Sequence, residues 1–354
     1  MHFVFRKCAA KVDVFFKICN IFVKKLMNKM KILGIGNALL DVLLRLENDN
    51  TLTDIGIQKG AMDLIQEEQM IAIHRAQAGL NRNEAPGGSV CNTMRALATL
   101  GAKVGYIGKV GTDANGDMYE KALLNAGVTP HIVRTEGISG CSTVLISPDG
   151  ERTMATFLGP AATLSASEIS DETLNSYDCI YIEGYLISNE ALFLPILQRA
   201  KKTGLKIALD LSNFNIVHGF KDLLSEVIPK YVQILFSNES EAEAYTGLKA
   251  EDAVQKISEQ VEISVVTIGK KGALVGSRGE YFAVPSLGKN PVDTTGAGDN
   301  FAAGFLYGLT RNTSFIQAAR IGSLLAGHVI ETIGSQIPDE RWCQIKLKVE
   351  EILG

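Results

Sequence analysis

The chain alternates short, continuously apolar runs with segments in which apolar residues recur at helical spacing. The runs lie at 31–36, 104–107, 179–182, 207–211, 234–236 and 265–268. Helical patterns, for example at 190–203 and 239–246, separate most of them. A strand that is apolar on both faces must be covered on both faces, and an intervening helix lets consecutive strands lie parallel. The pattern therefore predicts an α/β fold with a mostly parallel central sheet that helices cover on both faces.

Two segments do not follow this rhythm. The runs at 142–146 and 153–158 flank Pro148-Asp-Gly-Glu151, which is typical of a hairpin turn because Asp-Gly accepts positive φ at low cost. The stretch 42–66 is also short of long helices and is interrupted by polar residues. We expect strands from about 42–66 and 131–160 to form a small β-sheet that projects from the main domain, residues 31–354, as a lid.

Residues 1–30 differ from the rest of the chain. Their longest uncharged run, Ile18–Val23, is too short for a secretory signal or a membrane span. Asp13 is their one acid, against seven basic residues: Arg6, Lys7, Lys11, Lys17, Lys24, Lys25 and Lys29. This basic extension could form an amphipathic surface helix. We instead expect that the natural protein starts at Met27 or Met30, and no later stretch is apolar enough to span a membrane.

Charge and cysteine content narrow the classes of function. A net charge of −4 makes the chain a poor candidate for binding nucleic acid. The six cysteines form no CxxC pair, and no histidine lies at metal-ligand spacing from them. This argues against a zinc site or a disulfide framework and is typical of the reducing cytoplasm. Neither a dinucleotide-binding GxGxxG nor a Walker GxxxxGK[ST] motif is present.

The most informative segment is Asp293-Thr-Thr-Gly-Ala-Gly-Asp299, which leads into a helix of small and apolar residues. Amides of Gly296, Ala297 and Gly298 at a helix N-terminus would form an anion site suited to phosphate. The carboxylate of Asp299 would repel that anion, but it could accept a proton from a hydroxyl that attacks a phosphate. The residues alone leave a second interpretation open, in which Asp299 is an N-cap and the glycines only allow close helix packing.

The segment resembles the C-terminal signature of the ribokinase-like (PfkB) family of carbohydrate and nucleoside kinases. Pro86-Gly-Gly-Ser-Val-Cys-Asn-Thr93 is similar to a second family signature, and Asn238-Glu-Ser-Glu241 is similar to the NxxE motif of the family. The three motifs occur in the family's order between Met30 and the C-terminus. The resemblance implies a ribokinase-like fold and an ATP-dependent kinase that transfers the γ-phosphoryl group in line to an alcohol.

The resemblance also implies roles for the matched residues on the ATP side. Asp299 would be the general base, and the amides of Gly296, Ala297 and Gly298 would hold the transferring phosphoryl group. Asn238 and Glu241 would orient Mg²⁺ beside the ATP phosphates. Thr267 and Gly269 match the end of the family's nucleotide-binding strand. Asp293 and Thr295, with backbone from near Gly334, match the family's loop for a monovalent cation such as K⁺.

On the acceptor side, Asn37-Ala-Leu-Leu-Asp41 resembles the region that supplies the substrate carboxylate in the family. An aspartate can accept hydrogen bonds from two hydroxyls of a sugar. The second signature supplies the other candidates for acceptor binding, Gly87, Gly88, Ser89 and Asn92. Arg152, beside the hairpin turn, is either a solvated turn residue or a phosphate contact that forms when the lid closes.

The acceptor itself is predicted from small differences. The stretch 37–41 is more similar to adenosine kinases than to ribokinases, although Ala38 replaces a proline, and Ser89 stands where ribokinases typically have lysine. We expect a nucleoside as the small-molecule acceptor, with the 5′-hydroxyl of adenosine phosphorylated and Phe157 or Phe214 stacking on the base. The alternatives are a sugar kinase acting on ribose, fructose or a keto-deoxy sugar acid, and a non-catalytic sugar or nucleotide sensor. A monomer and a homodimer are both compatible with the sequence.

Overall fold

The computed structural model describes residues 30–76 and 83–354. A nine-stranded sheet forms the body, and all neighbouring strands from β12 to β6 are parallel, whereas β13 and β14 add to one edge as antiparallel strands. Across the sheet the order is β14 (Glu280–Val284), β13 (Ala273–Ser277), β12 (Ile263–Thr267), β11 (Ile234–Asn238), β10 (Lys206–Asp210), β9 (Cys179–Glu183), β1 (Ile32–Ile35), β5 (Val104–Gly111) and β6 (Thr129–Thr135). The expected fold class is confirmed.

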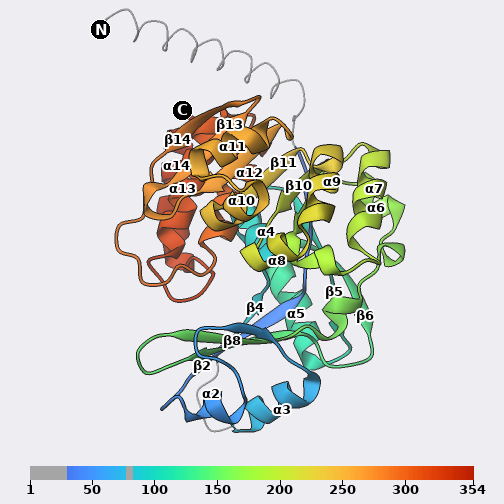
Figure 1. Ribbon diagram of the computed structural model, residues 1–354. Helices are drawn as coiled ribbons and strands as arrows, with labels where there is room; N and C mark the ends of the chain where they lie inside the picture. Colours follow the sequence, from blue (N-terminus) through green and yellow to red (C-terminus); the bar gives the residue numbers. More distant parts are fainter. Residues whose placement is uncertain (1–29, 77–82) are drawn as a thin grey trace, which may run out of the picture.

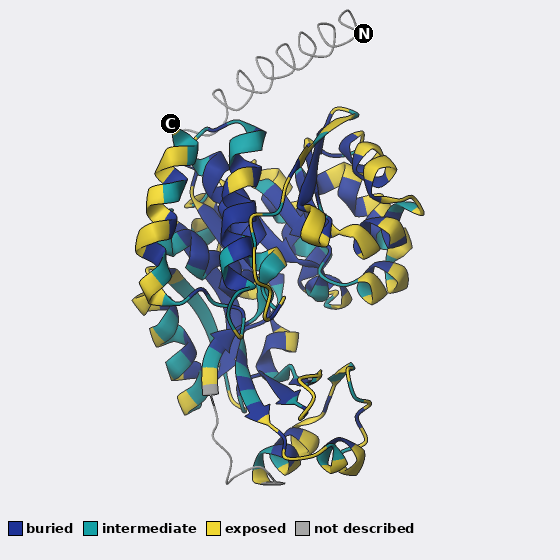
Figure 2. Ribbon diagram, turned by 90° about the vertical axis from the view of Figure 1, so that its left-hand side faces the viewer, coloured by how far each residue is buried: buried dark blue, intermediate teal, exposed yellow. Residues whose placement is uncertain are grey.

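Helices cover both faces of this sheet because side chains of each strand alternate between two cores. In β1, for example, Ile32 belongs to one core and Leu33 to the other. The first core is completed by α4 (Ser89–Thr99), α5 (Ala114–Asn125), α12 (Ala297–Thr310), α13 (Phe315–Val329) and α14 (Asp339–Leu353). The second is completed by α6 (Asp171–Asn175), α7 (Phe193–Thr203), α8 (Phe214–Gly219), α9 (Lys221–Tyr231), α10 (Glu239–Thr246) and α11 (Ala250–Ser258). Figure 2 shows the buried strands between exposed helix surfaces.

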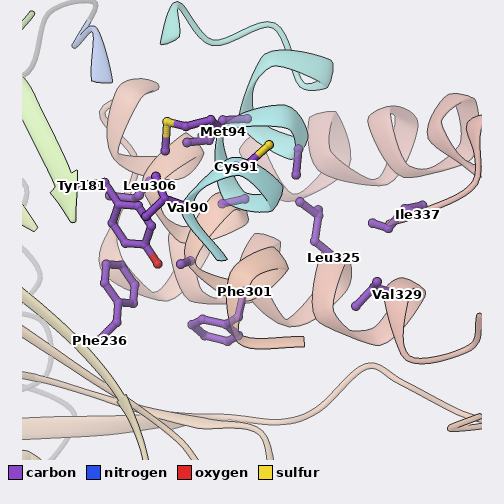
Figure 3. Close-up of a cluster of buried hydrophobic side chains, with 14 of the residues drawn as sticks. Val90, Cys91, Met94, Tyr181, Phe236, Phe301, Leu306, Leu325, Val329 and Ile337 are labelled. Atoms are coloured by element: carbon purple, nitrogen blue, oxygen red, sulfur yellow. The ribbon is translucent and has the colours of Figure 1, made fainter. Parts of the chain in front are cut away.

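The helices α4, α12 and α13 form the layer that carries two of the sequence motifs. Figure 3 shows Val90 of α4, Phe301 of α12 and Leu325 of α13 in one cluster with Tyr181 of β9 and Phe236 of β11. The Tyr181 and Phe236 rings meet edge to face with centroids 5.9 Å apart. This packing fixes the N-terminal ends of α4 and α12 relative to the sheet.

The helices α12 and α13 approach each other closely at a glycine pair. A Cβ on Gly304 would lie 2.6 Å from the backbone nitrogen of Gly322, which is well inside van der Waals contact. Glycine at position 304 therefore sets the distance between the two helices.

A second, five-stranded sheet projects from the body at the lower end of Figure 1. Its order is β3 (Met62–Leu64), β8 (Arg152–Phe157), β7 (Cys141–Ile146), β2 (Leu39–Arg45) and β4 (Asn83–Gly87). Along β2 the side chains alternate, and Leu40, Val42 and Leu44 are buried in a cluster that includes residues of α2 (Asn50–Asp54) and α3 (Glu67–Ala76). Asp41 lies on the opposite face.

The boundaries of this small sheet differ from the expected segments in two places. Residues 131–135 belong to β6 of the central sheet, because the α5 crossover brings them parallel to β5. Residues 83–87, which include the first two residues of the second signature, form the strand β4. Pro86 is compatible with this strand because β4 lies at the edge of the sheet, where a missing N–H is tolerated.

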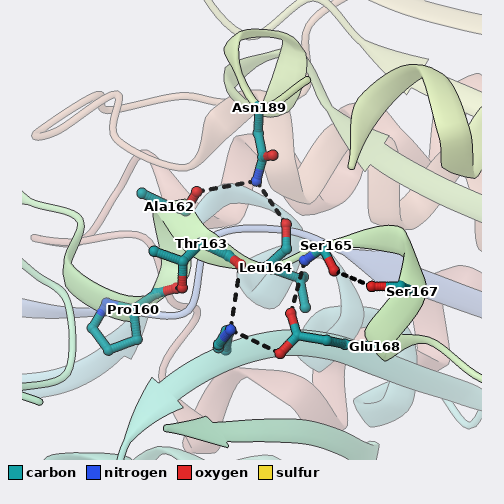
Figure 4. Close-up of polar contacts among 9 residues, drawn as sticks. Pro160, Ala162, Thr163, Leu164, Ser165, Ser167, Glu168 and Asn189 are labelled. Carbon is teal, nitrogen blue, oxygen red and sulfur yellow. Dashed lines mark hydrogen bonds and ion pairs between the residues drawn. The ribbon is translucent and has the colours of Figure 1, made fainter. Parts of the chain in front are cut away.

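Polar contacts fix the segment that returns from the small sheet to the body, residues 158–170. Lys109 of β5, which is buried, pairs with Glu168 at 2.8 Å. The side-chain amide of Asn189 donates to the carbonyl oxygens of Ala162 and Leu164, at 3.1 and 2.8 Å (Figure 4). The Lys109–Glu168 pair thus links this segment to β5, and the Asn189 contacts link it to the stretch between β9 and α7.

The expectations for the N-terminal extension concern residues 1–29 almost entirely, and these lie outside the described residues. Within residues 30–76 and 83–354, no helix has the length and apolar character needed to cross a membrane.

The packing of α12 on α13 predicts the effect of adding one methyl group. Gly304→Ala should lower the free energy of unfolding by about 1–3 kcal/mol because the new Cβ would force the two helices apart. Urea unfolding of the variant measures this change. The matched control is Gly219→Ala at the end of α8, where a Cβ would meet no described atom within 4 Å. Equal unfolding midpoints for the two variants would contradict the account.

Candidate active site

The candidate site lies at the carboxyl edge of the central sheet. Asn37 follows β1, and four other polar residues end neighbouring strands: Glu183 in β9, Asp210 in β10, Asn238 in β11 and Thr267 in β12. Glu183 pairs across the sheet with Asp210, and Asn238 pairs with Thr267. Ligands of open parallel sheets bind outside this edge because the connecting loops and helix ends meet there.

Two of the sequence motifs meet at the carboxylate of Asp299, in the first turn of α12. The Ser89 hydroxyl donates to Oδ1 of Asp299 at 2.7 Å, and Nδ2 of Asn92 donates to Oδ2 at 3.0 Å. Ser89 and Asp299 are 210 positions apart in the sequence. The two α4 residues thus hold both oxygens of the carboxylate and set its orientation.

The surroundings of Asp299 affect its protonation in opposite ways. Burial raises the pKa of its carboxyl group above the ordinary value of 3.8, and the hydrogen bonds from Ser89 and Asn92 oppose this rise. Asp299 as a whole residue is half-buried. A partly desolvated carboxylate of this kind is a stronger proton acceptor than an ordinary aspartate.

The glycines before Asp299 differ in what they do. Gly296 is the N-cap of α12 with φ of 74°, and a Cβ there would lie 2.7 Å from Cα of Ser335, so folding alone requires this glycine. Gly298 is exposed, and a Cβ there would meet no described atom within 4 Å. Helix packing therefore explains Gly296 but not Gly298, which faces open space at the helix N-terminus.

The N–H of Ala297, which was expected to hold the phosphoryl group, already has a hydrogen-bond acceptor. It donates to the carbonyl oxygen of Thr294 at 3.2 Å, because residues 294–297 form a turn. The expected amides of Gly296 and Gly298 remain candidates for an anion, and the Asp299 amide joins them because by position it lacks a helical acceptor.

Asp41 and the second signature form the opposite wall. A Cβ on Gly87 would lie 2.2 Å from the Asp41 carboxyl group, so glycine at this position leaves room for the carboxylate. Gly88 follows as the N-cap of α4. Burial, and secondarily the charge of Asp299, raises the pKa of Asp41 to about 7, and Arg95 opposes the shift.

Sequence reasoning missed Glu183, which holds two other parts of the site. Its Oε1 accepts hydrogen bonds from the backbone N–H and the side-chain amide of Asn37, at 2.9 and 2.8 Å. Its Oε2 accepts from the N–H of Val90 at 3.3 Å. The side chain is buried, and burial raises its pKa to about 7. A charged residue that ends the apolar run 179–182 was the available signal.

Sequence reasoning also missed Asp210, which ends strand β10 and lies inside the run 207–211, one residue before its end. It accepts hydrogen bonds from the Tyr181 hydroxyl at 3.1 Å and from the Ser212 N–H at 2.7 Å. Burial raises its pKa, and the charge of Asp299 raises it further.

The NxxE motif forms the start of α10. Asn238 Oδ1 accepts from the Glu241 N–H at 2.9 Å, and the Asn238 N–H and Nδ2 each donate to one Glu241 oxygen at 2.8 Å. Asn238 is exposed, whereas Glu241 is buried, and burial together with the charge of Asp210 raises the Glu241 pKa. A purely structural capping box does not require a buried carboxylate beside a second one.

This donor set fits Mg²⁺ in a complex with phosphates. The ion prefers oxygen ligands. Its positive charge would favour the ionised forms of Glu241 and Asp210, whose pKa values are raised without it. In the described residues, no group of three or more acidic, histidine or cysteine side chains could hold a metal ion alone. Phosphate oxygens and waters would therefore supply most of its ligands. Thr267 and the exposed Gly269 lie on the next strand end and the turn after it.

Arg152 begins β8 and reaches the loop before α12. Its guanidinium pairs with Oδ2 of Asp293 at 2.7 Å and donates to the Thr295 hydroxyl at 2.8 Å. The three residues expected at a phosphate and a cation site are thus in contact with one another. Of the two expected stacking rings, Phe157 is half-buried in β8, and Phe214 at the start of α8 is 46% exposed.

The raised pKa of Asp41 predicts how stability depends on pH. The folded protein holds a proton on Asp41 up to about pH 7, whereas the unfolded chain loses it near 3.8, so stability falls as pH rises between these values. Asp41→Asn should therefore raise the melting temperature clearly at pH 8 and little at pH 5. Thermal unfolding at both pH values measures this.

The control for that measurement is Glu351→Gln at the exposed end of α14, which should change the melting temperature equally at both pH values. If Asp41→Asn changes the melting temperature by the same amount at pH 5 and at pH 8, the Asp41 carboxyl group is not desolvated.

Comparisons with known proteins identify the family of the chain. Residues 55–342 match the family model described as pfkB family carbohydrate kinase. The chain is 29% identical over 270 residues to the ribokinase of Haemophilus influenzae, covering 73% of this chain and 85% of the relative.

Two solved structures share the fold over almost their whole length. The adenosine kinase from Sinorhizobium meliloti has a TM-score of 0.81 and 31% identity, covering 90% of this chain and 99% of that one. A probable sugar kinase from Rhizobium etli CFN 42 has the same TM-score and 30% identity, covering 92% and 99%. The chain therefore belongs to the PfkB family of carbohydrate kinases, and it is an ATP-dependent kinase of small molecules.

Proposed function

We propose that this kinase transfers the γ-phosphoryl group of ATP to the 5′-hydroxyl of a nucleoside, adenosine in the first place, with Asp299 as the general base. One observation carries the proposal: a carboxylate with a raised pKa stands beside the open helix end at Gly298. An anion at the helix end and a hydroxyl at the carboxylate would be neighbours. This is the arrangement that in-line phosphoryl transfer needs.

The reaction then follows from these groups. The acceptor oxygen attacks the γ-phosphorus while its proton passes to Asp299, and the bond from the γ-phosphorus to the bridging oxygen of ADP breaks. The N–H groups of Gly298 and Asp299, with the helix dipole, stabilise charge on the transferring group. Ser89 and Asn92 keep the carboxylate aimed. Mg²⁺ held beside Glu241 and Asn238 would supply positive charge against the phosphates of ATP.

The acceptor would bind between Asp41 and the start of α4. Asp41 can accept hydrogen bonds from two neighbouring hydroxyls, and Gly87 and Gly88 let a sugar approach the backbone. Asn37 would add a polar contact, and its orientation is set by Glu183. A ribose and a free sugar would both fit this polar half of the site.

The remainder of the small sheet favours a nucleoside over a free sugar. The register places Leu43, Val144, Met154 and Met62 in one cross-strand row, on the same face as Asp41. Leu64 lies on this face in the neighbouring row, and Met62 and Leu64 are 48% and 71% exposed. Val144 is buried, so Met62 and Leu64 form the exposed apolar part of this face. They suit a planar base, whereas a free sugar would bury little apolar area against them. We propose that this sheet closes over the acceptor as a lid and excludes water.

The second candidate is a sugar kinase. The equal TM-scores to an adenosine kinase and to a probable sugar kinase keep this acceptor class in consideration. Both candidates use the same transfer chemistry and differ only in what contacts the apolar face of the small sheet.

The base assignment predicts the effect of an isosteric change. Asp299→Asn should lower kcat by about a hundredfold or more, because a positioned general base contributes roughly 10²–10⁴-fold. ATP affinity, measured by calorimetry, should change little. Ser89→Ala should lower kcat less, since Asn92 still holds the carboxylate. An Asp299→Asn variant with near-normal kcat would identify the residue as a helix cap.

The acceptor is identified by a coupled assay of ADP release against nucleosides and free sugars. We expect turnover with adenosine to exceed turnover with ribose, fructose or keto-deoxy sugar acids. Asp41→Ala should raise KM for the acceptor and leave KM for ATP nearly unchanged. Turnover with a pentose or hexose alone would favour the sugar kinase, and an Asp41 effect confined to ATP would contradict its assignment.

A further inference from the structure

The loop before α12 was expected to bind a monovalent cation through Asp293 and Thr295. A cation of this kind needs oxygen atoms that are free to coordinate it and a local excess of negative charge. The side chains of Asp293 and Thr295 meet neither requirement.

Every oxygen of the two side chains is engaged. Oδ1 of Asp293 accepts from the Thr295 N–H and from the Thr295 hydroxyl, at 3.0 and 2.8 Å. Oδ2 accepts from the Gly334 N–H at 2.6 Å and pairs with Arg152 at 2.7 Å. The Thr295 hydroxyl, which donates to Asp293, also accepts from Arg152 at 2.8 Å. The side chains have no oxygen left for an ion.

The charge requirement is not met either. The Asp293 side chain is 5% exposed and that of Arg152 is 23% exposed, so the pair is largely shielded from water. Burial opposes ionisation of Asp293, but hydrogen bonds from Gly334 and Thr295 and the charge of Arg152 outweigh it, so its pKa lies below the ordinary value. The guanidinium balances the carboxylate and would repel a second cation beside it. The two residues therefore do not fit a monovalent cation.

Arg152 comes from a different part of the fold. It is the first residue of β8. Because side chains alternate along a strand, Arg152 lies on the same face as Met154 and Thr156, which is the face of the small sheet that carries Asp41. The loop that it contacts leads directly to Gly296, the N-cap of α12. Its side chain thus connects the small sheet to the helix end that was assigned to the phosphoryl group.

We propose that the Arg152 guanidinium takes the place of a monovalent cation in this kinase and holds the 293–296 loop in position from the small sheet. The role in transfer rests on the function proposed above, whereas the role in the loop does not. Two of its nitrogens are bound to Asp293 and Thr295, and its remaining N–H groups could still extend toward a phosphate. Catalysis is then independent of K⁺. Removal of Arg152 leaves the Asp293 carboxylate without a positive partner, and K⁺ can bind in the place of the guanidinium.

The test compares chloride salts of K⁺, Na⁺ and tetramethylammonium at equal ionic strength, about 0.15 M. In the unaltered protein, melting temperature and turnover should be the same in all three salts, within about twofold for turnover. Arg152→Gln should lower turnover by about tenfold or more in tetramethylammonium, because it leaves Asp293 buried and unpaired. K⁺ should restore part of that loss and raise the melting temperature of this variant by about 2 °C or more.

Two variants serve as controls. Arg152→Lys keeps the charge and should remain indifferent to the salt. Arg134→Gln removes another arginine that pairs with two carboxylates, Asp117 and Glu120, on α5; it should create no K⁺ dependence.

K⁺-specific stabilisation or activation of the unaltered protein would overturn the proposal, and so would an Arg152→Gln variant that does not respond to K⁺. The melting temperatures decide the matter even if no acceptor in the assay is phosphorylated, so failure of the proposed function and failure of this proposal can be distinguished.

Discussion

The carboxylate of Asp299, held between two hydrogen bonds from α4 at the open end of α12, is the interaction on which the site depends. Ser89 and Asn92 orient it, and burial raises its pKa. These contacts require α4 and α12 to start at the same place above the sheet. The close approach of α12 to α13 at Gly304 and the shared core with Tyr181 and Phe236 provide that constraint. The candidate site is thereby built from motifs that are distant in sequence.

The other acidic residues at this sheet edge are buried or half-buried, and their pKa values are raised. Glu183 orients Asn37 and the start of α4 through hydrogen bonds. The charge of Asp299 raises the pKa of Asp210, and the charge of Asp210 in turn raises the pKa of Glu241. Burying this many carboxyl groups at one sheet edge costs stability as pH rises, and their raised pKa values express that cost. A metal ion bound with the nucleotide would stabilise the ionised carboxylates at this edge. In the loop before α12, the positive charge of Arg152 neutralises the carboxylate of Asp293.

Much of this arrangement could be predicted from the sequence because local patterns are its cause. Continuous apolar runs predicted the parallel strands, and the glycine-rich turn before Asp299 predicted an anion site at a helix end. The roles of Glu183 and Asp210 could not be predicted in the same way, since a single acid after an apolar run has many explanations until neighbouring strands align their ends. Arg152 shows the same limit: its contact with Asp293 depends on where the small sheet lies, which no local pattern specifies.

The most direct test of the central claim is a crystal structure with the acceptor and a non-hydrolysable ATP analogue bound. The account predicts that the acceptor hydroxyl lies about 2.6–3.2 Å from an Asp299 oxygen. It also predicts that the terminal phosphate analogue faces the N–H groups of Gly298 and Asp299. A ternary complex in which Asp299 still contacts only Ser89 and Asn92, with the acceptor hydroxyl and the phosphate bound elsewhere, would contradict it.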